Sequence, residues 1–288
     1  MTGINKPSWL KIKLPSDSNF FYVSNLIKKN ELNTICQKAK CPNISECWSE
    51  RTATFLILGD SCTRNCAFCA VKKGNPKPIS EDEACRVADA VYRMGLSYTV
   101  ITSVTRDDLK DGGSSHFAHV IKTIRLKVPD IAIEVLIPDF QGDHNALKTI
   151  VDAQPEVLNH NLEVPEQLYP QINRPLKSYQ RSLELLGKAK EMGMHTKSGL
   201  MVGLGESWEE IIQTFSDLRE TKCDLLTIGQ YLQPTRHHIP VKKYYSPLNF
   251  KQLKKIALDW GFQEVESGPL IRSSYGARRM YRSLTEKH

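Results

Sequence analysis

The 288-residue sequence lacks any long hydrophobic run, and this absence excludes integral membrane proteins. No apolar segment approaches the about 18–20 residues that a membrane-spanning helix needs. The first ten residues, MTGINKPSWL, lack the apolar core of a secretory signal peptide, and no arginine precedes Arg51, which disfavours a transit peptide. We therefore expect a soluble, cytoplasmic protein with no membrane partner.

Cysteine is also scarce, and its placement is more informative than its number. Eight cysteines in 288 residues are too few for a disulfide scaffold. Six of them lie between Cys36 and Cys69, and such clustering in a reducing compartment indicates metal ligands before disulfides. The other two, Cys85 and Cys223, are expected to be small packed residues.

The net charge of +7 is unevenly distributed. Residues 1–50 carry seven basic and four acidic side chains, and residues 241–288 carry ten and four. A nucleic-acid-binding protein usually shows a basic stripe on a defined fold. The basic ends can equally offset an anionic cofactor or attract an acidic protein, and we expect no nucleic-acid partner.

From residue 54 onward, short apolar runs alternate with amphipathic helical patterns. The runs are nearly continuous in hydrophobicity, as strands that are covered on both faces tend to be. Six strand–helix units in series imply parallel strands with right-handed crossovers, in a doubly wound sheet or in a barrel short of the usual eight units. The predicted strands are Thr54–Leu58, Tyr98–Thr102, Ile131–Leu136, Val157–Asn161, Thr196–Val202 and Leu225–Gln230.

Capping boxes at Ser80-Glu81-Asp82-Glu83 and Ser207-Trp208-Glu209-Glu210 predict where two of the helices begin. Residues 1–53 and 241–288 do not follow the strand–helix rhythm, although the latter contain a predicted helix around 247–260 and a strand-like stretch at 263–266. We therefore predict an N-terminal extension of 1–53, a core of 54–240 and a C-terminal extension of 241–288.

Cys62, Cys66 and Cys69 form a CX3CX2C triplet directly after the first predicted strand. In barrels, this edge of the strands carries the chemistry. Three thiolates on one loop can hold three corners of a 4Fe–4S cluster and leave the fourth iron open to a substrate. Zinc is the alternative, but structural zinc prefers four tetrahedral ligands, usually as two spaced pairs.

This spacing, with Phe68 just before the last cysteine, resembles the radical S-adenosylmethionine superfamily. The resemblance implies a partial (β/α)6 barrel of parallel strands in the α/β class. It also implies a 4Fe–4S cluster whose open iron chelates S-adenosylmethionine, and reductive cleavage of this cofactor to methionine and a 5′-deoxyadenosyl radical.

A second triplet, Cys36, Cys41 and Cys47, has CX4CX5C spacing and lies upstream of the core. Alone it is explained almost as well by zinc or by buried cysteines. Beside the first triplet, and with Arg272-Ser273-Ser274-Tyr275 near the C-terminus, it resembles the lipoyl synthases. The likeness covers nearly the whole chain and includes the stretches Thr105–Leu109, Asp111–Gly113, Pro138–Phe140 and Asn159–Asn161.

The lipoyl synthase resemblance implies insertion of two sulfur atoms into an octanoyl chain on a lysine of a carrier protein, with two S-adenosylmethionine molecules consumed. The CX4CX5C cysteines would hold an auxiliary 4Fe–4S cluster that supplies the sulfur. Its fourth ligand would be Ser274, with Ser273 as the alternative, and both chain extensions would close over the barrel mouth. The implied partners are octanoylated lipoyl-carrier domains (2-oxoacid dehydrogenase acyltransferase subunits and the glycine-cleavage H protein), a reductant such as flavodoxin or ferredoxin, and an iron–sulfur carrier for cluster repair. We expect a monomer.

Contacts with S-adenosylmethionine are expected from four residues at or near strand ends: Asp107, Glu134, Asn161 and Gly203. Asp107 and its neighbour Asp108 could instead cap a turn. The pair at 237–238, two histidines in a loop, is expected to be solvated rather than metal-bound.

Two other readings fit part of the pattern. Another two-cluster radical enzyme is possible, but a methylthiotransferase needs larger terminal domains, and a biotin-synthase-like site draws its auxiliary ligands from barrel strands. The alternative outside the enzymes is a non-catalytic zinc- or iron–sulfur-binding protein that acts as a nucleic-acid adaptor.

Overall fold

The computed structural model describes residues 6–12, 15 and 17–286, so half of the N-terminal stretch considered above lies outside the described part. Contacts divide the chain into two compact units. The N-terminal unit comprises Ile12–Asn65 and Ala70–Glu156, and the C-terminal unit comprises Cys66–Cys69, Val157–His288 and Met1–Lys11, each so far as it is described. The division into a core and two extensions remains a prediction, as does their closure over a barrel mouth.

The N-terminal unit contains a sheet in which short, buried strands run side by side. β1 pairs antiparallel with β2, whereas β2, β5 and β6 pair in parallel in that order. A separate parallel pair, β3 with β4, follows β2 along the chain. The strands are β1 (Asn33–Thr34), β2 (Thr54–Ile57), β3 (Ser61–Cys62), β4 (Lys72–Lys73), β5 (Tyr98–Ser103) and β6 (Ala132–Leu136).

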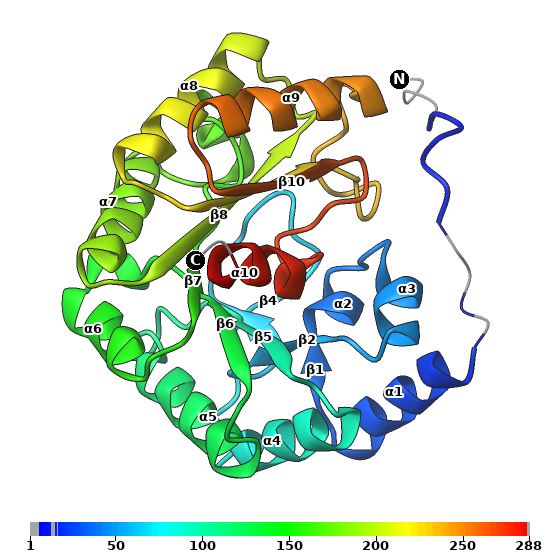
Figure 1. The fold of residues 1–288 in the computed structure, drawn as a ribbon, viewed down its shortest axis with the longest axis vertical. Coiled ribbons are helices and arrows are strands. Elements are labelled where there is room, and N and C mark those ends of the chain that lie inside the picture. Colours follow the sequence, from blue (N-terminus) through cyan, green and yellow to red (C-terminus); the bar gives the residue numbers. More distant parts are fainter. Residues whose placement is uncertain (1–5, 13–14, 16, 287–288) are drawn as a thin grey trace. The chain divides into compact units, whose positions relative to one another are not determined.

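The helices of this unit fall into two groups. Three long helices lie one beside the next, α4 against α5 and α5 against α6 (Figure 1). Short helices α2 and α3 carry the upstream cysteines, and α1 packs on α3. The helices are α1 (Ser18–Lys29), α2 (Ile35–Lys38), α3 (Ile44–Ser49), α4 (Glu83–Met94), α5 (Ser114–Lys127), the 3-10 turn η1 (Phe140–Gly142) and α6 (His144–Asp152).

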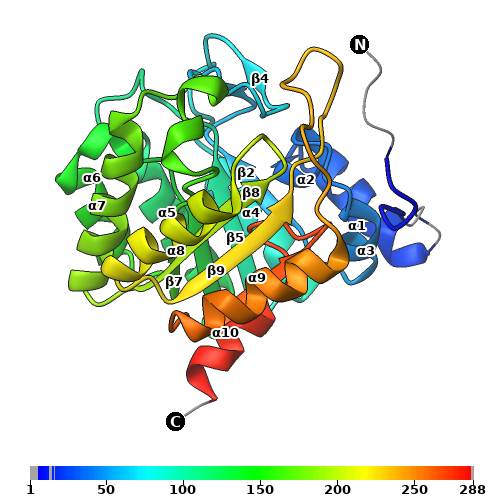
Figure 2. The ribbon, with the colours of Figure 1, turned by 90° about the horizontal axis from the view of Figure 1, so that it is seen from above.

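The C-terminal unit has four strands that pair in parallel in the order β7, β8, β9, β10. Helix α7 packs on β8, and α9 packs on β10. Helix α9 also packs on β9, and these two elements lie side by side in Figure 2. The elements are β7 (Val157–Asn159), η2 (Glu166–Leu168), η3 (Pro170–Ile172), α7 (Lys177–Glu191), β8 (His195–Val202), α8 (Trp208–Glu220), β9 (Leu225–Gln230), α9 (Pro247–Asp259), β10 (Glu264–Gly268) and α10 (Ala277–Thr285).

The C-terminal helix closes the amino-terminal ends of these strands. Met280 and Leu284 of α10 form a buried cluster with Val157 and Leu225, the first residues of β7 and β9. The carboxyl ends of the strands, where chemistry is expected in parallel folds, are therefore not the ends that α10 covers. In the described residues, no helix is both long and apolar enough to cross a membrane.

All six predicted strands are present within two residues of the predicted bounds, and the α/β class with parallel strands is confirmed. The Ser207 capping box is also confirmed, with Ser207 accepting from the Glu210 amide. The predicted capping box at Ser80 is wrong, because α4 begins only at Glu83 and has no side-chain cap. The Glu83 carboxylate instead accepts from the buried Leu58 amide and contacts His116.

The two isolated cysteines have different outcomes. Cys223 is fully buried, as predicted. Cys85 lies in α4 but is exposed, so the prediction that it is packed is wrong. The buried stripe of this helix includes Ala84, Val87 and Val91, and Cys85 lies outside it.

Asp224 connects α7, β8 and β10 at the start of β9, and its side chain is only 3% exposed. Its carboxylate accepts from Lys190 Nζ at 2.7 Å, from the Thr196 amide at 2.9 Å and from Gln263 Nε2 at 2.9 Å. Removing a buried carboxylate leaves these donors unsatisfied and an uncompensated lysine.

Asp224→Ala should therefore lower the free energy of unfolding by about 3 kcal/mol, measured by urea denaturation. Asp152→Ala is the matched control, because Asp152 is 60% exposed and forms a surface ion pair with Lys148. The control should lose less than about 1 kcal/mol. Equal losses for the two variants would contradict the role of Asp224.

Candidate functional site

The loop that carries Cys62 is fixed to the loop that follows β5. The Thr63 amide donates to the Thr105 carbonyl oxygen at 3.1 Å, and the Asp107 amide donates to Thr63 Oγ1 at 3.1 Å. The Arg64 amide lies 3.4 Å from Cys62 Sγ and donates to it. The backbone around the first cysteine of the CX3CX2C triplet is thus held in place by a neighbouring strand–helix loop.

Arg64 also joins two aspartates that follow different strands. Its Nε and Nη2 donate to the two Asp107 carboxylate oxygens at 2.8 and 2.9 Å, and Nη2 lies 2.5 Å from Asp139 Oδ1. Asp139 is buried, whereas Asp107 is partly exposed. Asp107 therefore orders the Cys62 loop, and its direct contact with a cofactor remains a prediction.

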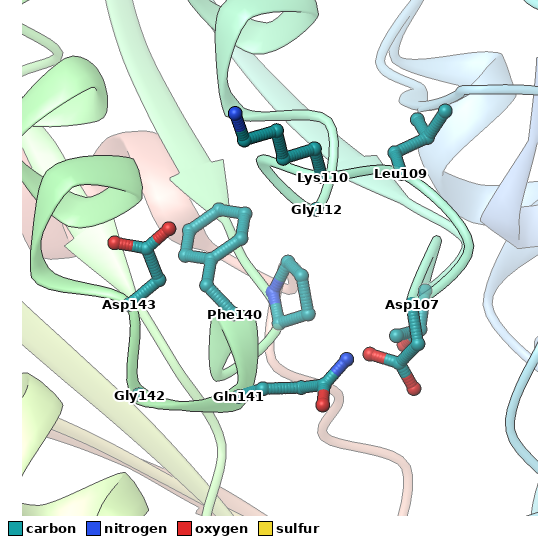
Figure 3. Close-up of a pocket in the computed structure, with 10 residues that line it drawn as sticks. Asp107, Leu109, Lys110, Gly112, Phe140, Gln141, Gly142 and Asp143 are labelled. Atoms are coloured by element: carbon teal, nitrogen blue, oxygen red, sulfur yellow. The ribbon is translucent and has the colours of Figure 1, made fainter.

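A cavity of about 460 Å³ lies at the carboxyl ends of β5 and β6, within the N-terminal unit. Lys110 and Gln141 lie at opposite sides of this cavity. The Phe140 ring has Asp143 on one side and these two residues on the other (Figure 3). Phe140 and Gln141 both have positive φ angles, 43° and 52°, which non-glycine residues adopt only at some cost. The remaining lining residues are Thr105, Asp107, Leu109, Gly112, Pro138 and Gly142.

Cys66 and Cys69 lie in a tight turn of the C-terminal unit. The Cys69 amide donates to the Cys66 carbonyl oxygen at 3.2 Å, and the Ala67 amide donates to the Ile172 carbonyl oxygen at 3.1 Å. His238 Nε2 lies 3.1 Å from the Cys69 carbonyl oxygen, so one histidine of the 237–238 pair supports this turn rather than standing free in solvent.

Arg174 is the charged neighbour of this turn. Its Nε donates to Cys66 Sγ at 3.4 Å, its guanidinium lies 5.9 Å from the Phe68 ring centre, and Nη2 lies 3.9 Å from Glu163 Oε1. Burial lowers the pKa of Arg174, but the Cys66 thiol and then Glu163 more than offset this and raise it. Burial raises the pKa of Glu163, and Arg174 opposes that rise. A permanent positive charge thus lies against a candidate cluster ligand.

Asn161 lies beside this pair with an unused acceptor. Its Nδ2 reaches Glu163 Oε1 at 3.5 Å, but its Oδ1 is buried and has no hydrogen-bond partner among the described residues. Gly199 on β8 leaves no room for a Cβ because Asn161 Oδ1 and Thr227 Oγ1 approach it. A buried acceptor without a partner is costly, so this corner fits a ligand that brings a donor, as a ribose hydroxyl or an ammonium group would.

The other two predicted cofactor residues are tied to the protein itself. Glu134 is fully buried and accepts from the Tyr98 hydroxyl at 2.8 Å. Gly203 has a φ of 106° and lies against Gln230 and the Lys243 carbonyl oxygen, which leave no space for a side chain. Its amide donates to Glu206, which also accepts from the amides of Leu204 and Gly205. Their contact with a cofactor remains a prediction.

The three cysteines of the CX4CX5C triplet all lie in the N-terminal unit. Cys36 lies on α2, Cys47 lies on α3, and Cys41 lies on the connection, where its amide donates to the Cys36 carbonyl oxygen at 2.9 Å. Burial, and then repulsion from Cys36 and Cys41, raise the pKa of Cys47. Cys41 affects the pKa of Cys36, and Cys36 and Cys41 both affect that of Cys47, so the three thiols are neighbours.

Cys36 is buried but is surrounded by donors. Burial, followed by the neighbouring Cys41, raises the pKa of its thiol to about 11. The neighbouring backbone amides of Thr54 and Cys36 and the Trp48 indole act in the opposite direction and lower this pKa. Such donors stabilise a thiolate far more than a thiol, so the donor set fits an iron-bound sulfur.

Ser274 lies in the turn between β10 and α10 and is half-buried. The turn is closed by the Tyr275 amide, which donates to the Arg272 carbonyl oxygen at 2.8 Å. The preceding Ile271 carbonyl oxygen lies so close to Gly229 of β9 that a side chain there would not fit. The role of Ser274 as an iron ligand remains a prediction.

Among the described residues, no three His, Cys, Asp or Glu side chains are arranged around a single metal ion.

Sequence reasoning missed Arg64, Arg174 and Glu163. A signal for Glu163 existed, because Asn159, Asn161 and Glu163 alternate where β7 ends and so share one side of an extended chain. The two arginines carry no periodic signal, since each lies alone in a loop and finds its partners far along the sequence.

Comparison with known proteins defines the class. The Radical SAM superfamily matches residues 56–218, so the chain belongs to this superfamily. Its fold is similar to those of Streptococcus suis SuiB bound to S-adenosylmethionine (TM-score 0.56, 12% identity, 78% of this chain and 53% of that one) and of the [FeFe]-hydrogenase maturase HydG (TM-score 0.56, 14% identity, 92% and 68%). The chain thus spans about half the length of SuiB, and these likenesses concern the fold alone.

Curated relatives are much closer in sequence. Lipoyl synthase of Rubrobacter xylanophilus is 54% identical over 94% of this chain and 85% of its own length, and that of Alkaliphilus metalliredigens is 53% identical over 98% and 97%. The chain belongs to the lipoyl synthase family, and it is an enzyme of the radical SAM class with a 4Fe–4S cluster and S-adenosylmethionine as its cofactors.

The raised pKa of Cys36 predicts how the iron-free protein reacts with iodoacetamide, because only the thiolate is nucleophilic. With a pKa of about 11, about 0.1% of the Cys36 thiol is ionised at pH 8, and this fraction rises nearly a hundredfold by pH 10. Mass spectrometry should find Cys85, which is exposed, labelled first at pH 8. Cys36 labelling should become appreciable only toward pH 10; labelling as fast as that of Cys85 at pH 8 would contradict the burial of Cys36.

Proposed function

We propose that this chain converts an octanoyl group, carried on a lysine of a lipoyl-carrier domain, into a lipoyl group by inserting two sulfur atoms. The observation that supports this most strongly is that Cys36, Cys41 and Cys47 are neighbours in the N-terminal unit, outside the CX3CX2C loop. The fold is shared with proteins of other names, such as SuiB and HydG, whereas under this proposal the second triplet provides a separate place for sulfur.

The ligands divide into two sets under this proposal. Cys62, Cys66 and Cys69 hold the 4Fe–4S cluster that binds S-adenosylmethionine, and Cys36, Cys41 and Cys47 hold an auxiliary 4Fe–4S cluster. By resemblance, Ser274 is the fourth ligand of the auxiliary cluster, with Ser273 as the alternative. When bound, these groups supply a hydrogen-abstracting radical from S-adenosylmethionine and sulfide for the product.

The side chains around the first set have positioning tasks. Arg64 holds the Cys62 loop against Asp107 and Asp139, so its amide stays aimed at the Cys62 sulfur. Arg174 places positive charge at the Cys66 sulfur, which offsets the negative charge of a thiolate-bound cluster. The free Oδ1 of Asn161 accepts a donor of the cofactor, and Glu163 balances Arg174 when the cofactor is absent.

The substrate explains why radical chemistry is needed. The carbons that receive sulfur in an octanoyl chain are saturated and carry no leaving group, so no nucleophile of the protein can act on them. The carrier domain must present its acyl-lysine, and the basic C-terminal segment, with ten basic and four acidic residues in 241–288, favours acidic carriers through faster association. A low-potential donor such as flavodoxin or ferredoxin supplies electrons, and an iron–sulfur carrier rebuilds the auxiliary cluster in the cytoplasm.

Two triple alanine variants test the division of ligands. Replacing Cys62, Cys66 and Cys69 should reduce the iron from about eight to about four atoms per chain and abolish formation of 5′-deoxyadenosine. Replacing Cys36, Cys41 and Cys47 should also halve the iron, yet leave 5′-deoxyadenosine formation without lipoyl product. Cys85→Ala, on the exposed face of α4, should match the parent in both measurements. Loss of all cleavage in the second variant would show that the two sets are not separate.

Isotope labelling tests the source of the sulfur. Protein reconstituted with ³⁴S-sulfide, freed of excess sulfide and reacted with an octanoyl-lysine peptide in unlabelled buffer should give product with two heavy sulfurs, seen by mass spectrometry. Because each chain holds one auxiliary cluster, the yield should stop at about one lipoyl group per chain. Unlabelled product, or many turnovers without added sulfide, would contradict the proposed role of this cluster.

A further inference from the structure

Leu58, which lies just ahead of Cys62 in the chain, has a backbone conformation that needs support. It directly follows β2, its side chain is fully buried, and its φ angle is 67°. A branched side chain in this left-handed region is costly and persists only where the surroundings hold it, and such residues gather at functional sites. The next residue, Gly59, has a φ of 95°. The chain therefore turns sharply between β2 and the cysteine loop.

Three separate contacts hold Leu58 in this conformation. Its amide donates to the Glu83 carboxylate at 2.9 Å, and its carbonyl oxygen accepts from Arg106 Nη1 at 3.2 Å. Its side chain packs so closely on Gly113 that a Cβ there would not fit. Arg106 is itself buried and is paired with Asp108 at 2.8 Å. Both backbone polar groups of Leu58 are thus bound by side chains from distant parts of the sequence.

The Glu83 carboxylate serves Leu58 rather than its own helix. Glu83 is the first residue of α4, yet this helix begins without a side-chain cap. His116, in the first turn of α5, places Nε2 2.7 Å from the same carboxylate oxygen that accepts from Leu58. An ionised carboxylate only accepts, so His116 donates to it from Nε2. The two side chains are 11% and 9% exposed, and a buried carboxylate with two donors is held in one position.

Cys62 is consequently anchored on both sides. The downstream anchor is Thr63, which is bound to Thr105 and Asp107 as described above. The upstream anchor is Leu58, and only residues 59–61 separate it from the cysteine. A change in chain direction at Leu58 therefore moves Cys62, because so short a segment cannot absorb it. Neither Glu83 nor His116 has a part in the catalytic proposal.

We propose that Glu83 is a positioning residue for the cluster that binds S-adenosylmethionine. Its carboxylate, oriented by His116, holds Leu58 in the left-handed conformation and thereby fixes the position of Cys62. Reactions between held groups depend on placement to within about 1 Å, so a displaced Cys62 lowers the rate of cofactor cleavage even where iron is still bound. This inference rests on the proposed function, because it assumes that Cys62, Cys66 and Cys69 hold that cluster.

The test uses the full-length chain with the CX4CX5C cysteines replaced by alanine, so that only one cluster contributes to the signals. In this background Glu83→Ala removes the acceptor, whereas Glu83→Gln keeps an oxygen that reaches the Leu58 amide. Glu156→Ala is the matched control in the same unit. The Glu156 carboxylate also accepts from a strand amide, that of Ile133 at 2.5 Å, but it does so near the amino end of β6.

Four measurements compare these proteins. Hydrogen–deuterium exchange of the segment 58–65 is followed in the iron-free protein, and iron content is measured after reconstitution. EPR spectra of the reduced cluster are recorded with and without S-adenosylmethionine, and kcat is determined for 5′-deoxyadenosine formation.

Glu83→Ala should exchange faster within 58–65, show an altered EPR signal with S-adenosylmethionine, and lose at least about tenfold in kcat. Glu83→Gln and Glu156→Ala should match the background. Loss of iron in Glu83→Ala alone, with faster exchange confined to 58–65, also supports the positioning role.

Three results overturn this role: unchanged kcat and EPR signal in Glu83→Ala, an equal defect in Glu83→Gln, or an equal defect in Glu156→Ala. If circular dichroism shows that Glu83→Ala does not fold, Glu83→Asp decides in its place. It keeps the charge but is one methylene too short for the bond to Leu58, so the same outcomes apply to it. A background protein that binds no iron would instead overturn the assignment of the CX3CX2C cysteines as cluster ligands.

Discussion

A charge or polar group that is buried must find a partner, and the candidate site is organised by this constraint. Arg64 is balanced by Asp107 and Asp139, and Arg174 by Glu163 and the Cys66 sulfur. The Glu206 carboxylate is satisfied by three successive amides in the loop after β8. Because each charge needs a partner on another loop, the loops at the carboxyl ends of the strands are held in defined positions within each unit.

The same constraint makes the exceptions informative. Asn161 Oδ1 and Trp48 Nε1 are buried without regular partners, and each lies beside residues that are expected to hold a cofactor or a cluster. Asn161 Oδ1 is an acceptor, so it suits a ligand with hydroxyl or ammonium hydrogens, whereas Trp48 Nε1 is a donor and suits an acceptor.

The strands were predictable because their cause is local. A strand covered on both faces needs apolar residues at nearly every position, and this requirement leaves a continuous run that can be read directly. The exposure of Cys85 was also readable, since the apolar stripe through Ala84, Val87 and Val91 leaves position 85 on the other side of α4. The start of α4 was not predictable from local sequence, because the Glu83 carboxylate is hydrogen-bonded to the Leu58 amide and contacts His116, and both residues are distant in sequence. Arg64 and Arg174 escaped prediction for the same reason, because the side-chain partners of Arg64 (Asp107 and Asp139) and of Arg174 (Cys66) are distant in sequence.

Fold and function separate clearly in this chain. The parallel-stranded fold is shared with SuiB and HydG at only 12–14% identity, so the fold alone does not select the substrate. The residues that distinguish the chain lie upstream of the matched region 56–218, on α2 and α3, which are only four and six residues long. Helices this short have little intrinsic stability and depend on packing, here on α1 and β2. Under the proposed function this site gives up its sulfur and is rebuilt, and short helices suit such a task because they can open locally while the strands of the fold remain intact.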